Sequence, residues 1–458
     1  MTALMFFNNS VPVASAAKKQ LFLRLNSATQ LRLSSNFAPK GPKARASLAT
    51  LSHHHSPLVP SKAALKLQTG EVFQASSFGA NKSVSGEVVF TTSVVGYPES
   101  MTDPSYRGQI LVFTQPLVGN YGVPAHGRDA FGLLKHFESE SIQVRGIIVN
   151  DYATRYSHWN AVESLGSWCI RSGIPAICGV DTRAVVTLLR DRGSTLGEIV
   201  IADSQHAALE GLYDPNKVNL VAEASTKTKQ VYNSGAPIKI ALIDCGVKHN
   251  IIRCLVKLGA EVSVVPWDYD VLADGEAAYD GVFISNGPGD PAKCIPTINN
   301  LAKMIKFHQM THNPVPIFGI CMGHQLLGLA AGFKSYKLPF GNRGHNQPAI
   351  NMLTGSCVIT SQNHGFALQD DANIPSGWMP YFKNANDGSN EGIRHVSLPY
   401  SSVQFHPEAM GGPRDAEYLF QDFIDQVKAF KANRNASKAS FASSGSISKT
   451  QAVSAIGI

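Results

Sequence analysis

A cysteine between glycines is the strongest candidate nucleophile in this sequence. Cys321 lies in GICMG, at the end of the apolar run VPIFGI and before the helical run GHQLLGLAAG. A strand, a tight turn and a helix in this order form a nucleophile elbow, in which glycines permit the turn and the reactive side chain stands clear of the sheet. The helix N-terminus also favours a thiolate, whose pKa can fall from about 8.5 to between roughly 3.5 and 7.5 in such settings. The alternative is a buried structural cysteine at a strand end.

Two histidines could serve as the base that a thiol nucleophile needs. His324 is three residues from Cys321, but a helix carries its side chain around the first turn, toward packing or a neighbouring loop. His406 follows the short run SVQF, and Pro407 turns the chain so that Glu408 can face the same imidazole. Residues two apart on an extended segment point to one side. We therefore predict a catalytic set of Cys321, His406 and Glu408, and a structural role for His324.

An acyl-transfer site also needs hydrogen-bond donors for the oxyanion. The backbone N–H of Met322 lies where an elbow supplies one, and the glycine-rich turn 285–290 (SNGPGD) could supply another. This turn is a poor phosphate cradle, because it has neither a Lys-Ser/Thr ending nor a dinucleotide fingerprint. With no nucleotide motif in the sequence, we expect this chain to bind no cofactor and no metal ion.

The elements that position these residues alternate from residue 238 onward. Short apolar runs and amphipathic runs follow one another, which predicts an α/β domain over 238–430 with a mainly parallel sheet covered by helices on both faces. We expect strands at 239–246, 261–267 and 315–320, a strand at 281–284 that runs into the Gly/Pro turn ending at 291, and helices at 249–259, 296–310, 323–332 and 415–431.

Residues 63–213 have a different pattern of apolar and polar residues and are predicted to form a smaller α+β domain. A hairpin is expected at 64–79, with Thr69-Gly70 at its turn. Further strands are expected at 87–97, 108–119, 145–153 and 195–203, and helices at 160–173 and 182–193. Residues 214–237 lose periodicity and gain Lys, Thr, Asn and Pro, which is typical of a linker.

Charge is spread unevenly along the 458 residues. Residues 1–70 hold nine Lys and Arg and no acid, while the rest holds 31 basic and 33 acidic residues, so the overall +7 does not point to a nucleic-acid partner. The Ser, Ala, Leu and basic residues of 1–62 are typical of a disordered transit peptide. We expect import into the chloroplast stroma, with the mitochondrion as the alternative because of the run LFLRLNSATQLRL, and a plain basic tail as a third possibility.

The remaining composition sets further bounds. The Ser-rich segment 431–458 is expected to be disordered. Seven cysteines without any C-x-x-C indicate free thiols. No apolar run approaches the about 18 residues of a membrane-spanning helix, so no membrane association is expected.

Three motifs carry a resemblance to known proteins. GICMGHQ, SNGPGDP and FHPE occur in the order found in class I (triad) glutamine amidotransferases, over about 238–430. The stretches 244–253, 361–366, 96–122 and 179–193 resemble the small subunits of carbamoyl phosphate synthetases, which extends the similarity to about 63–430. The family usually has Leu where Met322 stands; because the backbone amide is what contributes, the change should be mild.

The resemblance implies an activity. Cys321 would attack the side-chain amide of glutamine, His406 would protonate the leaving ammonia and later activate water, and Glu408 would hold the imidazole. Backbone amides of Gly289 and Met322 would bind the oxyanion. It also implies contacts with glutamine from the following residues: Ser105, Gly287, Gly289, Met322, Gln325, Asn363, Gly365 and Phe366. The role of His364 stays open.

The resemblance also implies a partner. The large subunit of a carbamoyl phosphate synthetase, in a heterodimer or a higher oligomer, would receive the ammonia through a tunnel and use ATP and Mg²⁺ to make carbamoyl phosphate from bicarbonate, for arginine and pyrimidine biosynthesis.

Other functions compete with this one. The glutaminase of another synthase, such as one making anthranilate or GMP, would lack the first domain, while a thiol peptidase or glutamyl hydrolase could use the same elbow. A degenerate, purely regulatory relative would lack a member of the catalytic set, and all three are present.

Overall fold

The computed structural model describes residues 61–202, 204, 211–275, 278–370 and 374–453. The proposed transit peptide therefore lies outside the described residues, apart from Ser61 and Lys62, and so do residues 454–458 of the tail.

The first described domain is built on a closed seven-stranded barrel. The strands follow one another around it in the order β1 (Lys62–Leu67), β11 (Thr195–Ile201), β3 (Val84–Thr91), β4 (Gln109–Phe113), β7 (Gly146–Ile148), β10 (Ala176–Cys178) and β2 (Val72–Ser77). The predicted hairpin is confirmed, because β1 pairs antiparallel with β2 and the N–H of Gly70 donates to the carbonyl of Leu67 at the turn.

Short helices and ribbons surround this barrel. They are α1 (Tyr97–Thr102), η1 (Pro104–Tyr106), α2 (Leu165–Arg171) and α3 (Thr182–Arg192), with the paired strands β5 (Leu117–Val118) and β8 (Asp151–Tyr152), and β6 (Val123–Pro124) and β9 (Ala161–Glu163). The expected helix 160–173 is thus half wrong: its first residues pair as β9, and the helix begins only after Ser164, whose hydroxyl accepts from the Ser167 N–H. The expected strand 87–97 also ends early, because Pro98 at the second position of α1 favours a helix start there.

The second domain contains a ten-stranded sheet. Its strand order is β12 (Gln230–Tyr232), β14 (Ala260–Pro266), β13 (Ile238–Asp244), β15 (Gly281–Ile284), β16 (Ile317–Ile320), β21 (Tyr400–Val403), β20 (Asn390–His395), β19 (Trp378–Asn384), β17 (Ser335–Asn351) and β18 (Cys357–Leu368). The five strands from β14 to β21 run parallel, as predicted. The four strands beyond β21 join antiparallel and were not predicted, so the sheet as a whole is mixed.

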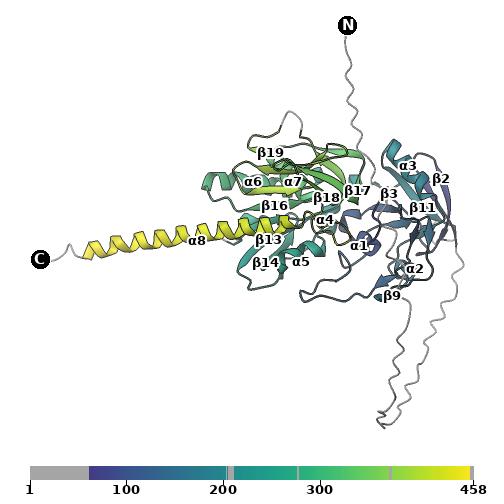
Figure 1. Ribbon diagram of the computed structural model, residues 1–458, viewed down its shortest axis with the longest axis horizontal. Coiled ribbons are helices and arrows are strands. Elements are labelled where there is room, and N and C mark those ends of the chain that lie inside the picture. The colour runs from purple at the N-terminus through teal and green to yellow at the C-terminus, as the bar shows by residue number, and fades with distance from the viewer. Residues whose placement is uncertain (1–60, 203, 205–210, 276–277, 371–373, 454–458) are drawn as a thin grey trace, which may run out of the picture. The chain divides into compact units, whose positions relative to one another are not determined.

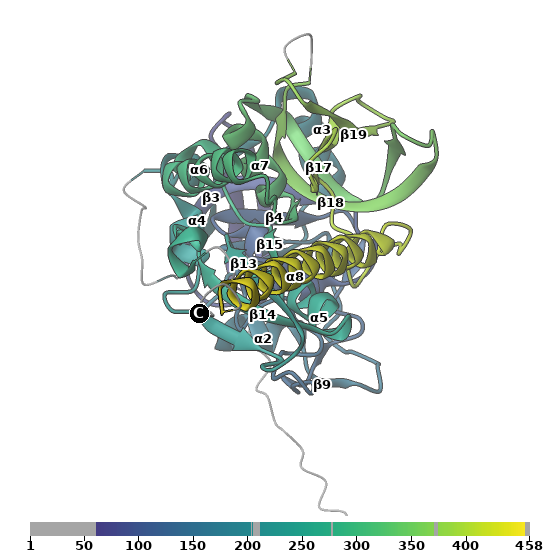
Figure 2. The same cartoon turned by 90° about the vertical axis from the view of Figure 1, so that its left-hand side faces the viewer.

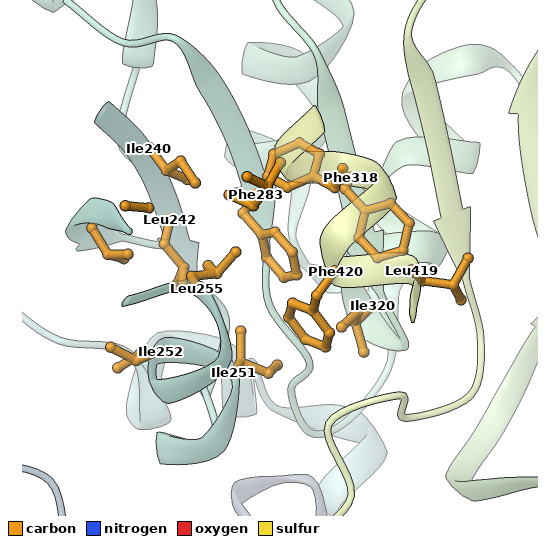
Figure 3. Packing of buried hydrophobic residues seen from close by; sticks show 14 of the residues in the cluster. Ile240, Leu242, Ile251, Ile252, Leu255, Phe283, Phe318, Ile320, Leu419 and Phe420 are labelled. Carbon is orange, nitrogen blue, oxygen red and sulfur yellow. The ribbon is translucent and has the colours of Figure 1, made fainter. Parts of the chain in front are cut away.

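Helices cover both faces of the parallel part of the sheet (Figures 1 and 2). They are α5 (His249–Lys257) and α8 (Tyr418–Val453) on one face, and α6 (Ile295–Thr311) and α7 (Met322–Ala331) on the other. Successive residues of β13 point to opposite faces, so Ile240 and Leu242 pack toward α5 and α8, while Ala241 and Ile243 pack toward α6 and α7. Figure 3 shows the first of these clusters, with Phe283 facing Phe420.

Two sequence predictions need correction here. Residues 214–237 are not a structureless linker, because they form η2 (Pro215–Lys217), α4 (Leu220–Ala224) and the sheet-edge strand β12. The tail is not disordered from residue 431, because α8 continues to Val453. Its first residues, 431–436, include Lys, Ala and Arg, which are good helix formers.

Two short 3-10 helices complete the second domain. They are η3 (Val271–Asp274) and η4 (Pro291–Lys293). η4 follows the turn 285–290, and the Asp290 side chain caps it by accepting from the Ala292 N–H.

Candidate active site

Cys321 lies at the junction of β16 and α7 in a conformation that side-chain-bearing residues rarely adopt. Its φ is 53° and its ψ is −101°. The flanking glycines allow this, because a Cβ on Gly319 would lie 2.6 Å from the Gly323 carbonyl and one on Gly323 would lie 2.2 Å from the Ile284 carbonyl oxygen. Strain of this kind persists only where the surrounding structure enforces it. The elbow predicted from the glycine spacing is therefore present.

The Cys321 thiol is nearly buried and faces a cavity. Its Sγ lies 3.7 Å from the backbone oxygen of Asn363, to which it donates. The cavity has about 500 Å³ of open space and is lined by Cys321 together with all eight residues expected to contact glutamine: Ser105, Gly287, Gly289, Met322, Gln325, Asn363, Gly365 and Phe366. The fold thus gathers residues from four separate stretches of the chain around one thiol.

Ser105 is the member of this set that comes from the first domain. It lies in η1, where the Asp103 carboxylate caps its N–H, and its hydroxyl accepts from the Asn286 amide at 3.0 Å. Asn286 belongs to the turn 285–290, whose Gly287 passes so close to the end of β13 that a Cβ there would lie 2.1 Å from the carbonyl oxygen of Cys245, the residue after that strand. The two domains therefore close the cavity together.

His406 and Glu408 form the expected pair. The imidazole Nδ1 lies 2.7 Å from Glu408 Oε1, and both side chains are almost fully buried. Burial and the charge of Lys248 disfavour a charged imidazole, but Glu408 and Cys321 raise the pKa of His406 to about 10. The second ring nitrogen, Nε2, is buried and forms no hydrogen bond with any residue in the described part of the chain. The ring is therefore held by Glu408 at Nδ1, while Cys321 acts on it without a hydrogen bond to Nε2.

Lys248 is a third member that sequence reasoning missed. Its Nζ lies 2.8 Å from the Glu408 carboxylate and 3.9 Å from that of Asp103. Burial favours the neutral acid, yet Lys248 and His406 lower the pKa of Glu408 to about 2. Burial likewise opposes the ammonium, yet Glu408, Asp103 and Glu138 raise the pKa of Lys248. Nothing in the spacing of the sequence links positions 248 and 408.

Replacing Lys248 with methionine should destabilise the protein. Glu408 would lose one of its two cationic partners while staying buried, and breaking a buried pair from one side costs about 3–5 kcal/mol. In the wild type, the lowered pKa of Glu408 contributes stability that is present above about pH 4.5 and is lost as the pH falls toward 2, because protonation ends the pairing. Urea unfolding at pH 7 and along that acid limb measures both effects.

Two variants serve as controls for Lys248→Met. Lys217→Met removes an exposed lysine and should change the free energy of unfolding by less than about 0.5 kcal/mol. Adding Glu408→Gln to Lys248→Met should restore much of the loss, because both charges are then gone. A loss below about 1 kcal/mol in Lys248→Met would contradict the assignment of a tightly coupled pair.

His324 lies in the packing rather than at the thiol. It is fully buried, and its Nδ1 is 3.0 Å from the Ser402 hydroxyl of β21. Burial lowers the pKa of His324 to about 3, with a smaller effect from His364. A neutral ring bonded to β21 holds α7 against the sheet, which is the structural role expected for it.

His364, whose role was open, closes one side of the cavity. Its Nδ1 must donate to the Phe366 carbonyl, 2.9 Å away, because a carbonyl only accepts. Burial lowers the pKa of His364 to about 4, and Arg343 and His406 act in the same direction. The ring is fixed from both sides, because its Nε2 also lies 3.1 Å from the side-chain oxygen of Gln362.

Four charged side chains at the cavity were also missed by sequence reasoning. Glu87 of β3 lies 2.5 Å from Lys337 of β17 and accepts from Gln109 at 2.9 Å, and Arg107 and Arg343 line the same space. Glu87 and Lys337 are 250 positions apart in the chain. No local pattern could have paired them.

A second cavity borders the first at Asn363. It has about 460 Å³ of open space, and His406, Lys248, Asp103, Glu138 and Ser361 are among its lining residues. Burial raises the pKa of Glu138 to about 7, and Glu408 and Asp103 add to this against the opposing charge of Lys248. The His406 imidazole therefore has a polar space beside it that is distinct from the cavity at Cys321.

Further observations concern other kinds of site. Over the described ranges, no group of three or more His, Cys, Asp or Glu could hold a metal ion. No helix in the same part of the chain has the length and apolarity needed to cross a membrane. All seven cysteines are free thiols, as their spacing indicated.

Comparison with known proteins covers both domains. A family model described as glutamine amidotransferase class-I matches residues 241–426, and one described as carbamoyl-phosphate synthase small chain, CPSase domain, matches residues 65–199. A carbamoyl phosphate synthase arginine-specific small chain from Neurospora crassa is 55% identical over 408 residues, covering 89% of this chain and 88% of its own. The protein of the same name from Chaetomium globosum is 51% identical, covering 93% and 92%. Among solved structures, a glutamine amidotransferase from Thermotoga maritima aligns with 42% of this chain and 85% of its own, at 16% identity and a TM-score of 0.31.

Proposed function

This chain belongs to the family of carbamoyl phosphate synthase small chains, and from that membership we propose how its site works. The chain is the glutamine-hydrolysing component of such a synthase and serves arginine biosynthesis. The observation that carries the residue assignment is the strained Cys321, facing a cavity lined by every residue expected to contact glutamine.

The first half of the reaction forms a thioester. The Cys321 thiolate attacks the side-chain amide carbon of glutamine, and the backbone N–H groups of Gly289 and Met322 stabilise the oxyanion. The carbon–nitrogen bond then breaks, and the departing nitrogen takes a proton from the His406 imidazolium to leave as ammonia. The pairing of His406 with Glu408 at 2.7 Å supports this step, because it favours the protonated ring.

The second half hydrolyses the thioester. His406, now neutral, takes a proton from water, whose oxygen attacks the acyl carbon. The carbon–sulfur bond breaks, glutamate leaves, and the thiolate and imidazolium are restored. Lys248 holds the Glu408 carboxylate ionised throughout, so the imidazolium keeps its counter-charge.

The charged residues at the cavity suit one end of the substrate. Arg107, Lys337, Arg343 and Glu87 line it, and because Glu87 pairs with Lys337 and Glu223 pairs with Arg107 at 3.7 Å, one cation remains in excess. The excess positive charge favours the α-carboxylate of glutamine over neutral amides of similar size.

Ammonia is proposed to leave through the second cavity toward a large-subunit partner, which carries the ATP- and Mg²⁺-dependent steps. That cavity borders His406, which releases the ammonia. Exposed apolar side chains lie at this cavity: Met410 (37% exposed) lines it, and Val94 (67%) and Val95 (54%) stand in the chain between its lining residues Ser93 and Gly96. Such a patch beside a product route is suited to being covered by the partner.

Charges placed on this patch should weaken the complex. In Val94→Asp/Val95→Asp, the large subunit should co-purify poorly, because a buried unpaired carboxylate opposes association. The isolated chain should keep its basal glutamine hydrolysis. Ile295→Asp/Met310→Asp, on equally exposed residues of α6, is the matched control and should bind normally. Equal binding by both variants would place the interface elsewhere.

One experiment tests the function as a whole. The chain is assayed for glutamate release from glutamine, and for carbamoyl phosphate after addition of the large subunit, bicarbonate and Mg·ATP. Glutamate release that rises in the complex supports the proposal. Glutamate release without any carbamoyl phosphate would favour an independent hydrolase or the glutaminase of another synthase.

Two further proposals concern the cellular setting. The composition of residues 1–62 supports import into the chloroplast stroma, with the mitochondrion as the alternative. Carbamoyl phosphate made there would also supply pyrimidine biosynthesis. A fluorescent protein fused after residues 1–62 should enter plastids, and a cytosolic signal would refute the targeting proposal.

A further inference from the structure

Gln404 is a buried side chain that the mechanism above does not use. It lies two residues before His406, directly after β21, and is fully buried. Its backbone N–H donates to the Glu391 carbonyl at 2.9 Å, which extends the pairing of β20 and β21 by one residue. The side chain thus enters the protein interior behind the substrate cavity from a rigid part of the sheet.

The Gln404 side chain contacts Gln325, which lines the cavity one helical turn after Cys321. Gln404 Oε1 accepts from Gln325 Nε2 at 3.0 Å, and the same nitrogen donates to the Phe366 carbonyl at 2.8 Å. The two ends of the amide are assigned by this network, because the Phe366 carbonyl can only accept. Once Gln325 Nε2 faces that carbonyl, the atom of Gln404 beside it must be the oxygen.

This arrangement uses both protons of the Gln325 amide. Its Oε1 receives no hydrogen bond from any residue in the described ranges, yet it is not among the enclosed atoms that lack a partner. The oxygen is therefore left for the cavity, where it can only accept. The Phe366 carbonyl, which holds the same amide, also accepts from His364 at 2.9 Å, so both anchors of Gln325 are themselves fixed.

The contact with Gln325 leaves the amide nitrogen of Gln404 without a hydrogen bond to any described residue. Its own Nε2 is buried with no partner in the described part of the chain. An unpaired buried donor is unfavourable, and an apolar residue of similar size would avoid it. The useful atom at this position is therefore the acceptor oxygen.

We propose that Gln404 is a positioning residue that fixes the orientation of the Gln325 amide, so that Gln325 Oε1 accepts a hydrogen bond from the α-ammonium group of the substrate. This rests on the proposed glutaminase function. The charged side chains of the cavity supply the complementary half, since their excess of cations suits the α-carboxylate. Without Gln404, the second proton of the Gln325 amide has no partner and the amide can rotate away.

The test compares two substrates that differ only in the α-ammonium group. Full-length chain in complex with the large subunit is assayed with L-glutamine and with glutaramate, the same amide without the amino group. Gln404→Leu should raise KM for glutamine roughly tenfold with little change in kcat, because a hydrogen bond to a charged group is misplaced. KM for glutaramate should hardly change, so the preference for glutamine should fall by about the same factor. Gln404→Glu keeps an acceptor oxygen and should restore most of that preference.

Several outcomes would overturn the proposal. One is an unchanged KM for glutamine in Gln404→Leu. Another is an equal loss with both substrates, which would mean that Gln325 contacts the reacting amide instead. Melting temperatures of both variants show whether either effect is merely a loss of folding. If the wild-type complex hydrolysed neither amide, the glutaminase function itself would be wrong, and the two failures are thus distinguishable.

Discussion

Replacing Cys321 with alanine should abolish glutamine-dependent synthesis of carbamoyl phosphate while the complex still uses free ammonia. The thiol is the group placed to form the acyl intermediate, and removal of a covalent nucleophile typically costs at least about 10³-fold in rate. The overall structure should tolerate the change, because alanine keeps the Cβ that Cys321 already carries in this conformation and only the sulfur is removed. Carbamoyl phosphate is measured with glutamine and with ammonium chloride as alternative nitrogen sources.

The control for this variant is Cys357→Ala. Cys357 is an exposed free thiol at the start of β18, so its loss should leave both activities unchanged. If Cys321→Ala lost ammonia-dependent synthesis as well, the division of labour between the two subunits would be wrong.

His406→Ala should impair thioester formation far more than His324→Ala. His406 supplies the proton to the leaving group, and loss of a general acid–base usually costs about 10²–10⁴-fold. His324 is neutral, bonded to Ser402 and buried against β21, so its removal should act mainly on stability. Acid-quench trapping of the labelled acyl-enzyme gives the order of the two effects.

Stability measurements separate the two histidines further. His324→Ala opens a cavity between α7 and β21 and should lower the melting temperature, because a buried ring is lost. If instead His324→Ala stopped acylation in a fully folded protein while His406→Ala acylated normally, the roles assigned here would have to be exchanged.

Local sequence was enough to place the nucleophile. The spacing of Gly319, Cys321 and Gly323 defines the elbow. Only glycine fits at the two flanking positions, because a side chain on Gly323 would clash with the backbone of β15 and one on Gly319 would clash with the carbonyl of Gly323. The i, i+2 relation of His406 and Glu408 likewise predicts that both groups lie on one side of the chain, as their 2.7 Å contact confirms. The alternation of strands and helices after residue 238 predicted the parallel core, since each strand there is buried on both faces.

The glutamine-contacting residues came from resemblance rather than from spacing. Ser105, Asn363 and Gln325 lie on η1, β18 and α7, and no periodicity joins them. In the folded protein they line one cavity. In the sequence, only the motifs shared with the family identified them.

What the tertiary structure alone decided are the partners of the charged and amide groups. Lys248 reaches Glu408 across 160 positions, Glu87 reaches Lys337 across 250, and Gln404 holds Gln325 across 79. Such pairs depend on how the barrel closes, how the antiparallel strands extend the sheet and where the domains meet. These contacts result from the packing of the whole chain, whereas the Cys321 elbow is a local structure. The spacing of residues in the sequence can specify a turn. Only the folded path of the backbone brings a buried charge to its counter-charge.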